Sequence, residues 1–170
     1  MHIFLTGEIQ IGKSTVLQKT LALLGVPYGG FRTYFGPDRY EPSHDLYINA
    51  AAQPKVFAPE NAVARFRADS RPEAFAERFD MLGASYIKEA AARARLIVMD
   101  ECGTLESQAL IFQHRILDAL DRDVPVLGVV KLAARGWADR IRRHPKVKLI
   151  TVDTLNRDRL PEEIAGRLFR

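Results

Sequence analysis

Residues 7 to 14 of this 170-residue chain are Gly7-Glu8-Ile9-Gln10-Ile11-Gly12-Lys13-Ser14. They match the pattern Gly-x-x-x-x-Gly-Lys-Ser/Thr at every fixed position, which is the Walker A signature of a phosphate-binding loop. The glycines let the backbone curl with its N–H groups pointing inward, at the start of a helix whose dipole favours anions. We assign all eight residues, and Thr15 at the start of that helix, to nucleotide binding.

The segments on either side of this loop have the patterns that the motif requires. Residues 2–6 are a short apolar run typical of a buried strand, and residues 13–24 have apolar positions at helical spacing. A match that lies between a strand and a helix is much more specific than the letters alone. The sequence therefore predicts a P-loop protein that binds a nucleoside triphosphate such as ATP or GTP.

Two side chains of the loop have chemical roles that follow from their residue types. The Lys13 ammonium group would bridge the β- and γ-phosphate oxygens as a point charge. The Ser14 hydroxyl is a hard oxygen ligand of the kind that Mg²⁺ prefers. We therefore expect Mg²⁺ as the cofactor, with Ser14 as a metal ligand and Lys13 as a catalytic residue.

The rest of the chain alternates between apolar strand patterns and amphipathic helix patterns. Helices are predicted at 72–95, 110–120, 137–143 and 161–169. Strands are predicted at 31–35, 45–49, 55–57, 96–99, 125–130 and 147–152. The two short strands at 45–49 and 55–57 could pair antiparallel. Strands that alternate with helices through short loops argue for an α/β fold of three layers, a mostly parallel sheet with helices on both faces.

Length and composition are those of one globular domain. The 47% of apolar and 27% of charged residues are ordinary values, and a chain of this length can bury about two-thirds of its unfolded surface in one core. We expect a single domain over residues 1–170. The apolar run at residues 2–6 is too short for a signal peptide or a membrane span, so we expect a cytoplasmic protein without a membrane partner. A monomer is the working expectation.

One stretch carries much of the excess positive charge. It contains Arg135, Arg140, Arg142, Arg143, Lys146 and Lys148. A contact with nucleic acid would be one use of this charge. A solvated helix face explains it better, because nucleic-acid domains usually add aromatic platforms or a recognisable reading motif.

The apolar run at 96–99 ends abruptly in Asp100-Glu101. A P-loop enzyme needs a distant carboxylate at the carboxyl end of a neighbouring strand to complete the Mg²⁺ shell opposite Ser14, and Asp100 meets that requirement. A carboxylate directly after it can orient or deprotonate a water for in-line attack on the γ-phosphorus. We assign Asp100 to the metal and Glu101 to catalysis, which favours hydrolysis with water as the acceptor.

Three further residues near these acids have less specific signals. Glu106 is either a charge in the first turn of a helix or a support for the site. Lys131, just past the apolar strand at 125–130, is either solvated or close enough to reach the γ-phosphate. Cys102 is most simply a small buried residue, and as the only cysteine it cannot form an internal disulfide.

Four segments occur in an order that resembles the THEP1-type nucleoside-triphosphatases. They are the phosphate loop, Gly29-Gly30-Phe31-Arg32-Thr33, Asp100-Glu101-Cys102-Gly103-Thr104-Leu105-Glu106, and Asn156-Arg157-Asp158 with Leu160-Pro161. In that family the loop is followed by a Gly-Gly-Phe-x-Thr strand, an Asp-Glu-Ile-Gly-x-Met-Glu segment, and an Asn-Arg-Asp segment before the last helix. The resemblance spans nearly the whole chain.

The resemblance implies a RecA/AAA-like P-loop fold and a slow hydrolysis of ATP, GTP and other triphosphates to the diphosphate and phosphate. It implies that Asp100 lies at the metal, Glu101 at the attacking water, and Glu106 beside them as a supporting acid. It also implies that Asn156 and Arg157 bind near the nucleoside. An ordinary loop that leads into the last helix is nearly as good an explanation of these two residues.

The chain departs from the family pattern at three places. Cys102 occupies a position where isoleucine is common, and Thr104 occupies a lysine-like position. After Phe35 the chain lacks the family's Arg-x-x-Gly-x-Arg stretch, so the resemblance assigns no role to Arg32 or Arg39.

Two other functions are compatible with the sequence. A P-loop kinase would phosphorylate a nucleoside or another small molecule, with residues 39–55 as the acceptor pocket. A nucleotide-dependent binding module would use the basic stretch to contact nucleic acid or a protein, with hydrolysis only resetting it. Hydrolysis is favoured over both because Glu101 directly follows the metal-binding acid.

Overall fold

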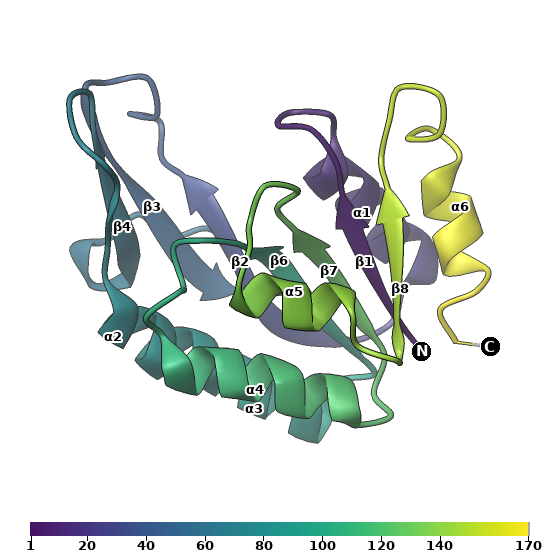
Figure 1. Ribbon diagram of the computed structural model, residues 1–170. Coiled ribbons are helices and arrows are strands. Elements are labelled where there is room, and N and C mark those ends of the chain that lie inside the picture. Colours follow the sequence, from purple (N-terminus) through teal and green to yellow (C-terminus); the bar gives the residue numbers. More distant parts are fainter. Residues whose placement is uncertain (170) are drawn as a thin grey trace.

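A computed structural model of the protein describes residues 1–169, with an eight-stranded sheet and helices on both sides of it (Figure 1). The strands are β1 (His2–Thr6), β2 (Tyr28–Phe35), β3 (Ser43–Ala50), β4 (Ala62–Arg67), β5 (Glu73–Ala74), β6 (Leu96–Cys102), β7 (Val126–Val130) and β8 (Val147–Thr151). The helices are α1 (Lys13–Leu24), η1 (Pro59–Asn61), α2 (Ala76–Arg78), η2 (Phe79–Gly83), α3 (Ala84–Arg93), α4 (Leu110–Asp121), α5 (Trp137–Arg142) and α6 (Leu160–Ala165). None of these helices has the length and apolar character needed to cross a bilayer.

The sheet joins a parallel half to an antiparallel half. Its order is β5-β4-β3-β2-β6-β7-β1-β8, in which β2, β6, β7, β1 and β8 pair in parallel. β3, β4 and β5 extend the sheet in antiparallel pairs. The prediction of a mostly parallel sheet therefore holds for the half that carries the phosphate loop, whereas the sheet as a whole is mixed.

Each face of the sheet is covered by its own group of helices. α3, α4 and α5 pack on one face around Phe4 and Phe112, and α1 and α6 pack on the other around Leu5 and Leu17 (Figure 1). β1, β6 and β7 are buried on both faces, which is why their sequences contain continuous apolar runs, whereas β2 and β8 are partly exposed. β7 accommodates the ring of Phe4 because position 128 is glycine: a Cβ on Gly128 would lie 2.4 Å from that ring.

The elements of the parallel half lie where the sequence patterns predict them. The strand at 2–6 and the helix at 13–24 have the predicted bounds. β6, α4, β7, α5 and β8 also occur at the predicted places, with small differences at their ends. The last helix is shorter than predicted, because α6 ends at Ala165 and turns follow it.

The predicted strand at 55–57 is wrong. These residues lie in an irregular loop, and the strand that pairs with β3 is β4. Hydrogen bonds to side chains hold this loop, whereas a strand would be held by backbone hydrogen bonds to its neighbour. The Val56 N–H donates to the Tyr34 hydroxyl oxygen and that hydroxyl donates to the Val56 carbonyl, each over 2.7 Å. The Asn61 amide adds a second bond to the same carbonyl over 2.9 Å, so the local β propensity is overridden by contacts with distant residues.

The predicted helix at 72–95 begins later and is interrupted. Glu73 and Ala74 form β5 beside β4, and the helix begins with α2. The π-helical turn η2 then separates α2 from α3. Its Gly83 lies against the ring of Phe112 on α4, where a Cβ would come within 2.4 Å of a ring carbon. The glycine thus permits the close approach of two helical segments.

Candidate active site

The phosphate loop connects β1 to α1 at the carboxyl ends of the parallel strands (Figure 1). Three of its residues have positive φ angles: Gly7 at 142°, Gln10 at 61° and Gly12 at 108°. A Cβ at position 7 would lie 2.6 Å from the Val152 carbonyl oxygen, so only glycine fits there. The loop therefore has the curled backbone that the two motif glycines permit.

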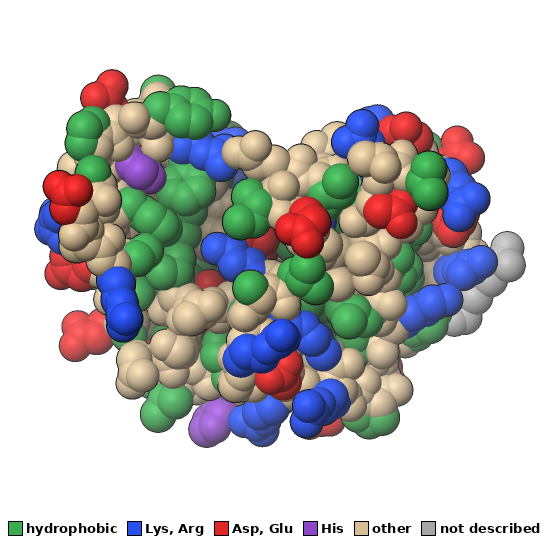
Figure 2. Space-filling view, turned by 45° about the horizontal axis from the view of Figure 1, so that its top comes forward, with side chains coloured by type: hydrophobic (Ala, Val, Ile, Leu, Met, Phe, Trp, Pro, Cys, Tyr) green, Lys and Arg blue, Asp and Glu red, His purple; other side chains and the backbone are tan. Residues whose placement is uncertain are grey.

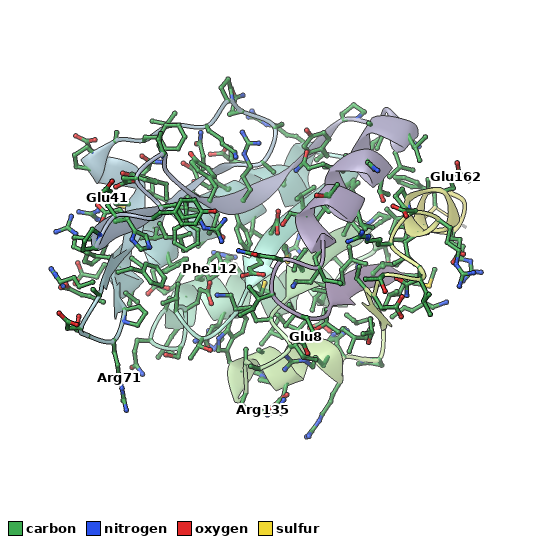
Figure 3. The ribbon with its side chains drawn as sticks, turned by 90° about the horizontal axis from the view of Figure 1, so that it is seen from above. Glu8, Glu41, Arg71, Phe112, Arg135 and Glu162 are labelled. Carbon is green, nitrogen blue, oxygen red and sulfur yellow. The ribbon has the colours of Figure 1, made fainter. Side chains whose placement is uncertain are left out.

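Lys13 places its ammonium group against the carbonyls of this loop. Its Nζ donates to the Gly7 carbonyl over 3.0 Å and to the Glu8 carbonyl over 2.7 Å, and the residue is 9% exposed. The side chains of Glu8, Ile9 and Gln10 are exposed. Figure 3, seen from above the strand ends, shows Glu8 near the middle of this face, with Glu41 and Arg71 on one side and Glu162 on the other. The tip of the loop is thus open to solvent while its lysine is buried.

Ser14 and Asp100 meet at the first turn of α1. The Ser14 hydroxyl donates to Asp100 Oδ1 over 3.2 Å. Burial raises the pKa of Asp100 to about 7, and the neighbouring Glu101 carboxylate adds to the rise, whereas the hydrogen bond from Ser14 acts against it. A hydroxyl and a carboxyl oxygen side by side are two hard donors of the kind that Mg²⁺ takes. Residues 1–169 hold no group of three or more His, Cys, Asp or Glu side chains placed to bind a metal.

Thr33 on β2 holds the strand end that carries both acids. Its hydroxyl donates to the Asp100 carbonyl over 3.3 Å and accepts the Glu101 N–H over 3.4 Å. The peptide bond between Asp100 and Glu101 is cis. In the register of β2 with β6, Arg32 lies beside Asp100. The Gly-Gly-Phe-x-Thr pattern contains Thr33 but does not reveal its role, because the strand that it supports lies 67 residues further along the chain.

Glu101 is paired with the lysine that follows β7. The Lys131 Nζ lies 3.3 Å from Glu101 Oε1, with the Lys131 side chain 47% exposed and that of Glu101 28% exposed. Lys131 is thus solvated and also paired with a carboxylate, and its reach to the γ-phosphate stays a prediction. Its ammonium group lies in the cavity that Asp100 and Glu101 also line.

Hydrogen bonds from α5 hold the loop that carries Lys131. Arg142 donates to the carbonyls of Lys131 and Ala134, so one charge of the basic stretch has partners within the fold. Trp137 on the same helix is buried, and its Nε1 donates to the Gly103 carbonyl over 2.9 Å. α5 thus supports both loops that meet around Glu101.

Glu106 is buried below the same loop. It is 3% exposed, and its Oε2 accepts the Gly103 N–H over 2.8 Å. Burial raises the pKa of Glu106 to about 7, against the lowering effect of that hydrogen bond. Of the two interpretations of Glu106, a solvated helix charge is excluded. Cys102 is completely buried, as predicted, and burial raises the pKa of its thiol.

The two residues assigned to the nucleoside have different places. Arg157 lies against the phosphate loop, and its Nη1 donates to the Ile11 carbonyl over 3.5 Å. Arg157 also lines a cavity of about 320 Å³ together with Gly12 and Thr15. Asn156 instead bonds within its own loop, where its amide donates to the Thr151 carbonyl over 2.8 Å. The structure brings Arg157 to the phosphate loop and gives Asn156 a supporting position.

A second cavity, of about 280 Å³, connects Ser14, Asp100, Glu101 and Lys131. Its opposite wall comes from β2, β3 and β4 and the turn between β2 and β3. The wall residues include Phe35, Arg39, Leu46 and Phe66. Figure 2 shows a hollow on this face with hydrophobic side chains along one side. The sequence patterns do not reveal the aromatic part of this wall, because it belongs to the antiparallel half of the sheet.

Comparison with known sequences gives matches over nearly the full length. Residues 2–165 match a protein family described as NTPase. The chain is 30% identical to the nucleoside-triphosphatase THEP1 of Thermofilum pendens, with 98% of this chain and 94% of that protein covered. It is 31% identical to the nucleoside-triphosphatase THEP1 of Methanosarcina acetivorans, with 100% and 98% covered.

Two solved structures resemble the fold. The crystal structure of THEP1 from the hyperthermophile Aquifex aeolicus covers all of both chains with a TM-score of 0.81 and 24% identity. The solution structure of a human cancer-related nucleoside triphosphatase covers 97% of this chain and 95% of that one, with a TM-score of 0.69 and 22% identity. At these identities the two matches establish the mixed α/β architecture.

Proposed function

The chain belongs to the NTPase family and is a nucleoside-triphosphatase, and from this premise we propose how its site works. The bond that it cleaves is the one between the β- and γ-phosphates of ATP, GTP and other triphosphates. Water is the acceptor, and the products are the diphosphate and phosphate. The contact between Ser14 and Asp100 at 3.2 Å carries the proposal, because it joins the phosphate loop to the acidic strand end.

The phosphate groups bind in the loop. Backbone N–H groups of residues 7–14, at the start of α1, provide the anion site, and the buried ammonium group of Lys13 adds a positive charge. Lys13 already lies at the loop carbonyls, so its position requires little reorganisation when the β- and γ-phosphates bind. Lys13 is therefore assigned to catalysis, and the loop residues together with Thr15 to nucleotide binding.

Ser14 and Asp100 fit a Mg²⁺ ion. Both offer hard oxygen atoms, and Mg²⁺ is usually held by one or two protein ligands together with phosphate oxygens and waters. Bound there, the ion neutralises charge that develops on the phosphates. The burial that raises the pKa of Asp100 would be offset by the positive charge of such an ion.

Glu101 positions the attacking water and accepts its proton. Its carboxylate lines the cavity beside Asp100, and the Thr33 hydroxyl fixes the backbone on which it is carried. Lys131 neutralises Glu101 at 3.3 Å and provides a cation in the same cavity. A second positive charge near the γ-phosphate is a common requirement of this reaction, and Lys131 is placed to supply it.

The nucleoside extends towards Arg157. Arg157 lies against the phosphate loop, and Thr15 lines the same cavity, which is separate from the one that Glu101 lines. Asn156 shapes the loop that carries Arg157. A flat guanidinium group stacks on any base, which suits an enzyme with little base preference.

The assignment to the RecA/AAA-like branch and to a single domain rests on topology. β7 lies between β1, which leads into the phosphate loop, and β6, which carries the acids. This separation by one strand supports the RecA/AAA-like branch. The two apolar clusters lie on opposite faces of one sheet, which supports a single domain over residues 1–170.

Release of phosphate with Mg²⁺ and after its removal by EDTA tests the proposal. ATP, GTP, CTP and UTP are each expected to give phosphate and diphosphate in equal amounts, and EDTA is expected to stop the release. Ser14→Ala should raise the Mg²⁺ concentration needed for half-maximal activity. Release of pyrophosphate, or activity that survives EDTA, would show that the site works in another way.

A further inference from the structure

The cavity beside Glu101 has a second wall that does not belong to the phosphate site. Its volume is about 280 Å³, and its part beside Ser14 and Asp100 is where the proposed Mg²⁺ ion and γ-phosphate would lie. Much of its lining lies on β2, β3 and β4, on the far side from the phosphate loop. A site that only activates water has no use for this second wall.

The cavity continues into a second hollow of about 430 Å³ towards β5. The two spaces share four lining residues, Phe66, Thr104, Leu105 and Lys131. Together they form one groove, here called the side groove, which leads from Glu101 along β4. Figure 2 shows this face hollowed beside hydrophobic side chains. The dimensions are those of a site for a small molecule, with one end at the catalytic acid.

The wall of the side groove is built from aromatic and aliphatic side chains. The rings of Phe35 and Phe66 meet edge to face at 5.3 Å, and Leu46 lines the same wall. His44 stacks on Phe66 at 5.3 Å with an angle of 5°, and the Arg39 guanidinium lies 5.0 Å from the Phe35 ring. Flat groups are thus already stacked in rows along this wall. Such a surface favours a flat ring as its occupant.

The charges around the side groove nearly cancel. Lys131, Arg39 and Arg71 bring three positive charges, and Asp100, Glu101 and Glu106 bring three carboxyl groups. Lys131 is already paired with Glu101 at 3.3 Å. Arg71 at the outer end points away from the body of the protein in Figure 3. This balance suits an uncharged molecule better than nucleic acid, which would need an excess of positive charge.

We propose that the side groove binds a nucleoside, a flat ring carrying a primary hydroxyl group, and that the protein transfers the γ-phosphoryl group to that hydroxyl as well as to water. The inference rests on the proposed function, because it uses the same γ-phosphate site. The nucleoside oxygen forms a bond to the γ-phosphorus, the bond from that phosphorus to the β–γ bridging oxygen breaks, and the diphosphate leaves. Glu101 takes the hydroxyl proton, and the products are a nucleoside monophosphate and a nucleoside diphosphate.

The proposal is tested with ATP that carries ³²P in its γ-phosphate, by measuring which product receives the label. The full chain is incubated with Mg²⁺ and, in turn, adenosine, guanosine, cytidine and uridine, and the products are separated. Label in a nucleoside monophosphate with at least one nucleoside is the expected result. Label in inorganic phosphate alone, with all four, overturns the transfer reaction and leaves the hydrolase intact. Absence of any released label contradicts both proposals.

Phe66→Ala tests whether the phosphoryl transfer to the nucleoside takes place in the side groove. Stacking on an aromatic ring contributes enough to base binding that its loss should lower the ratio of nucleoside monophosphate to inorganic phosphate by about tenfold. Phe169→Ala is the matched control, because Phe169 follows α6, lines neither cavity of the groove and is 41% exposed. The control should keep both the ratio and the rate. An unchanged ratio in Phe66→Ala would assign the transfer to another site or to a contaminating kinase.

A measurement on the unaltered protein covers the case in which Phe66→Ala does not fold. A nucleoside in the side groove occupies the place of the attacking water beside Glu101, so water and nucleoside compete for the same phosphoryl group. Release of inorganic phosphate should therefore fall as the monophosphate appears. Inorganic phosphate that stays constant while the monophosphate rises would show two independent sites and refute the groove.

Discussion

The two halves of the sheet are held together in different ways. In the parallel half, β6, β7 and β1 contain apolar runs buried on both faces, whereas β8 is a partly exposed edge strand. The antiparallel half also buries apolar side chains, such as Ile48 and Val63, but it adds polar side-chain contacts, such as the bidentate bond between Arg65 and Asp45 and the four bonds of Asn61. The parallel half carries the phosphate chemistry, and the antiparallel half carries the opposite wall of the cavity. The proposed catalytic residues and the residues that shape the opposite wall of the cavity thus come from separate segments of the chain.

Lys13→Ala should have the largest effect and should leave the fold intact. The substitution removes the positive charge from the phosphate site, and loss of one charge-stabilising donor lowers activity by about 10²–10³-fold. Phosphate release at saturating Mg²⁺ and ATP measures the effect. Lys88→Ala is the control, since Lys88 is exposed on α3 and distant from the loop. Activity within a few-fold of the unaltered protein would remove Lys13 from the mechanism.

Asn61→Ala tests the other half, where the expected effect falls on stability. Its amide donates to the Ile48 and Val56 carbonyls over 2.9 Å each, and its Oδ1 accepts the Ala58 N–H over 3.0 Å. Leaving these groups without partners should lower the free energy of unfolding by about 1–3 kcal/mol. Urea unfolding measures it.

Asn49→Ala is the matched control for that substitution. The Asn49 amide is bonded to the Pro54 carbonyl at the surface, where water can replace it, so the loss should be smaller. Equal losses in the two variants would show that the antiparallel half does not depend on the part-buried bonds of Asn61 to Ala58 and Ile48.

The sequence could predict the parallel half because its information is local. A continuous apolar run followed by Asp100 identifies both a buried strand and a site residue. The strand at 62–67 could not be found in this way, because the loop before it is bonded by Tyr34 and Asn61 through contacts far apart in the chain. The places of Phe35 and Phe66 in the cavity wall could not be predicted for the same reason. They depend on the pairing of β2, β3 and β4, which occurs only in the folded protein.

The candidate site was predictable to a similar degree. Lys13, Ser14 and Asp100 have positions that a motif or a strand end defines, and the structure brings Ser14 and Asp100 into contact. Thr33 and the pairing of Lys131 with Glu101 depend on neighbours in the sheet that the sequence order does not reveal. Motifs therefore predicted the groups that we propose to react, and the fold was needed to find the groups that hold them.

Glu106→Gln should change the stability of the protein by an amount that depends on pH. The pKa of Glu106 is about 7 in the folded protein against an ordinary value of 4.5, chiefly because of burial. Between these values the unfolded chain loses the proton first, so the stability of the unaltered protein falls as pH rises from about 4.5 to 7. Glutamine keeps an oxygen that can accept the Gly103 N–H and has no charge to bury.

The variant should therefore gain stability relative to the unaltered protein as pH rises through this window, with little difference below pH 4.5. Urea unfolding at several pH values measures the difference, in which the shared contribution of Asp100 cancels. A difference that is independent of pH would mean that the Glu106 carboxyl is not held in its neutral form by burial.

Glu101→Gln tests the central claim most directly, with phosphate release and nucleotide binding measured on the same preparation in Mg²⁺. Glutamine keeps the size of the side chain but cannot accept a proton from water, so phosphate release should fall by about 10²–10⁴-fold while ATP still binds. Glu89→Gln, at an exposed site on α3, should change neither. Phosphate release that persists at the unaltered rate in Glu101→Gln would contradict the assignment of Glu101 as the residue that activates water.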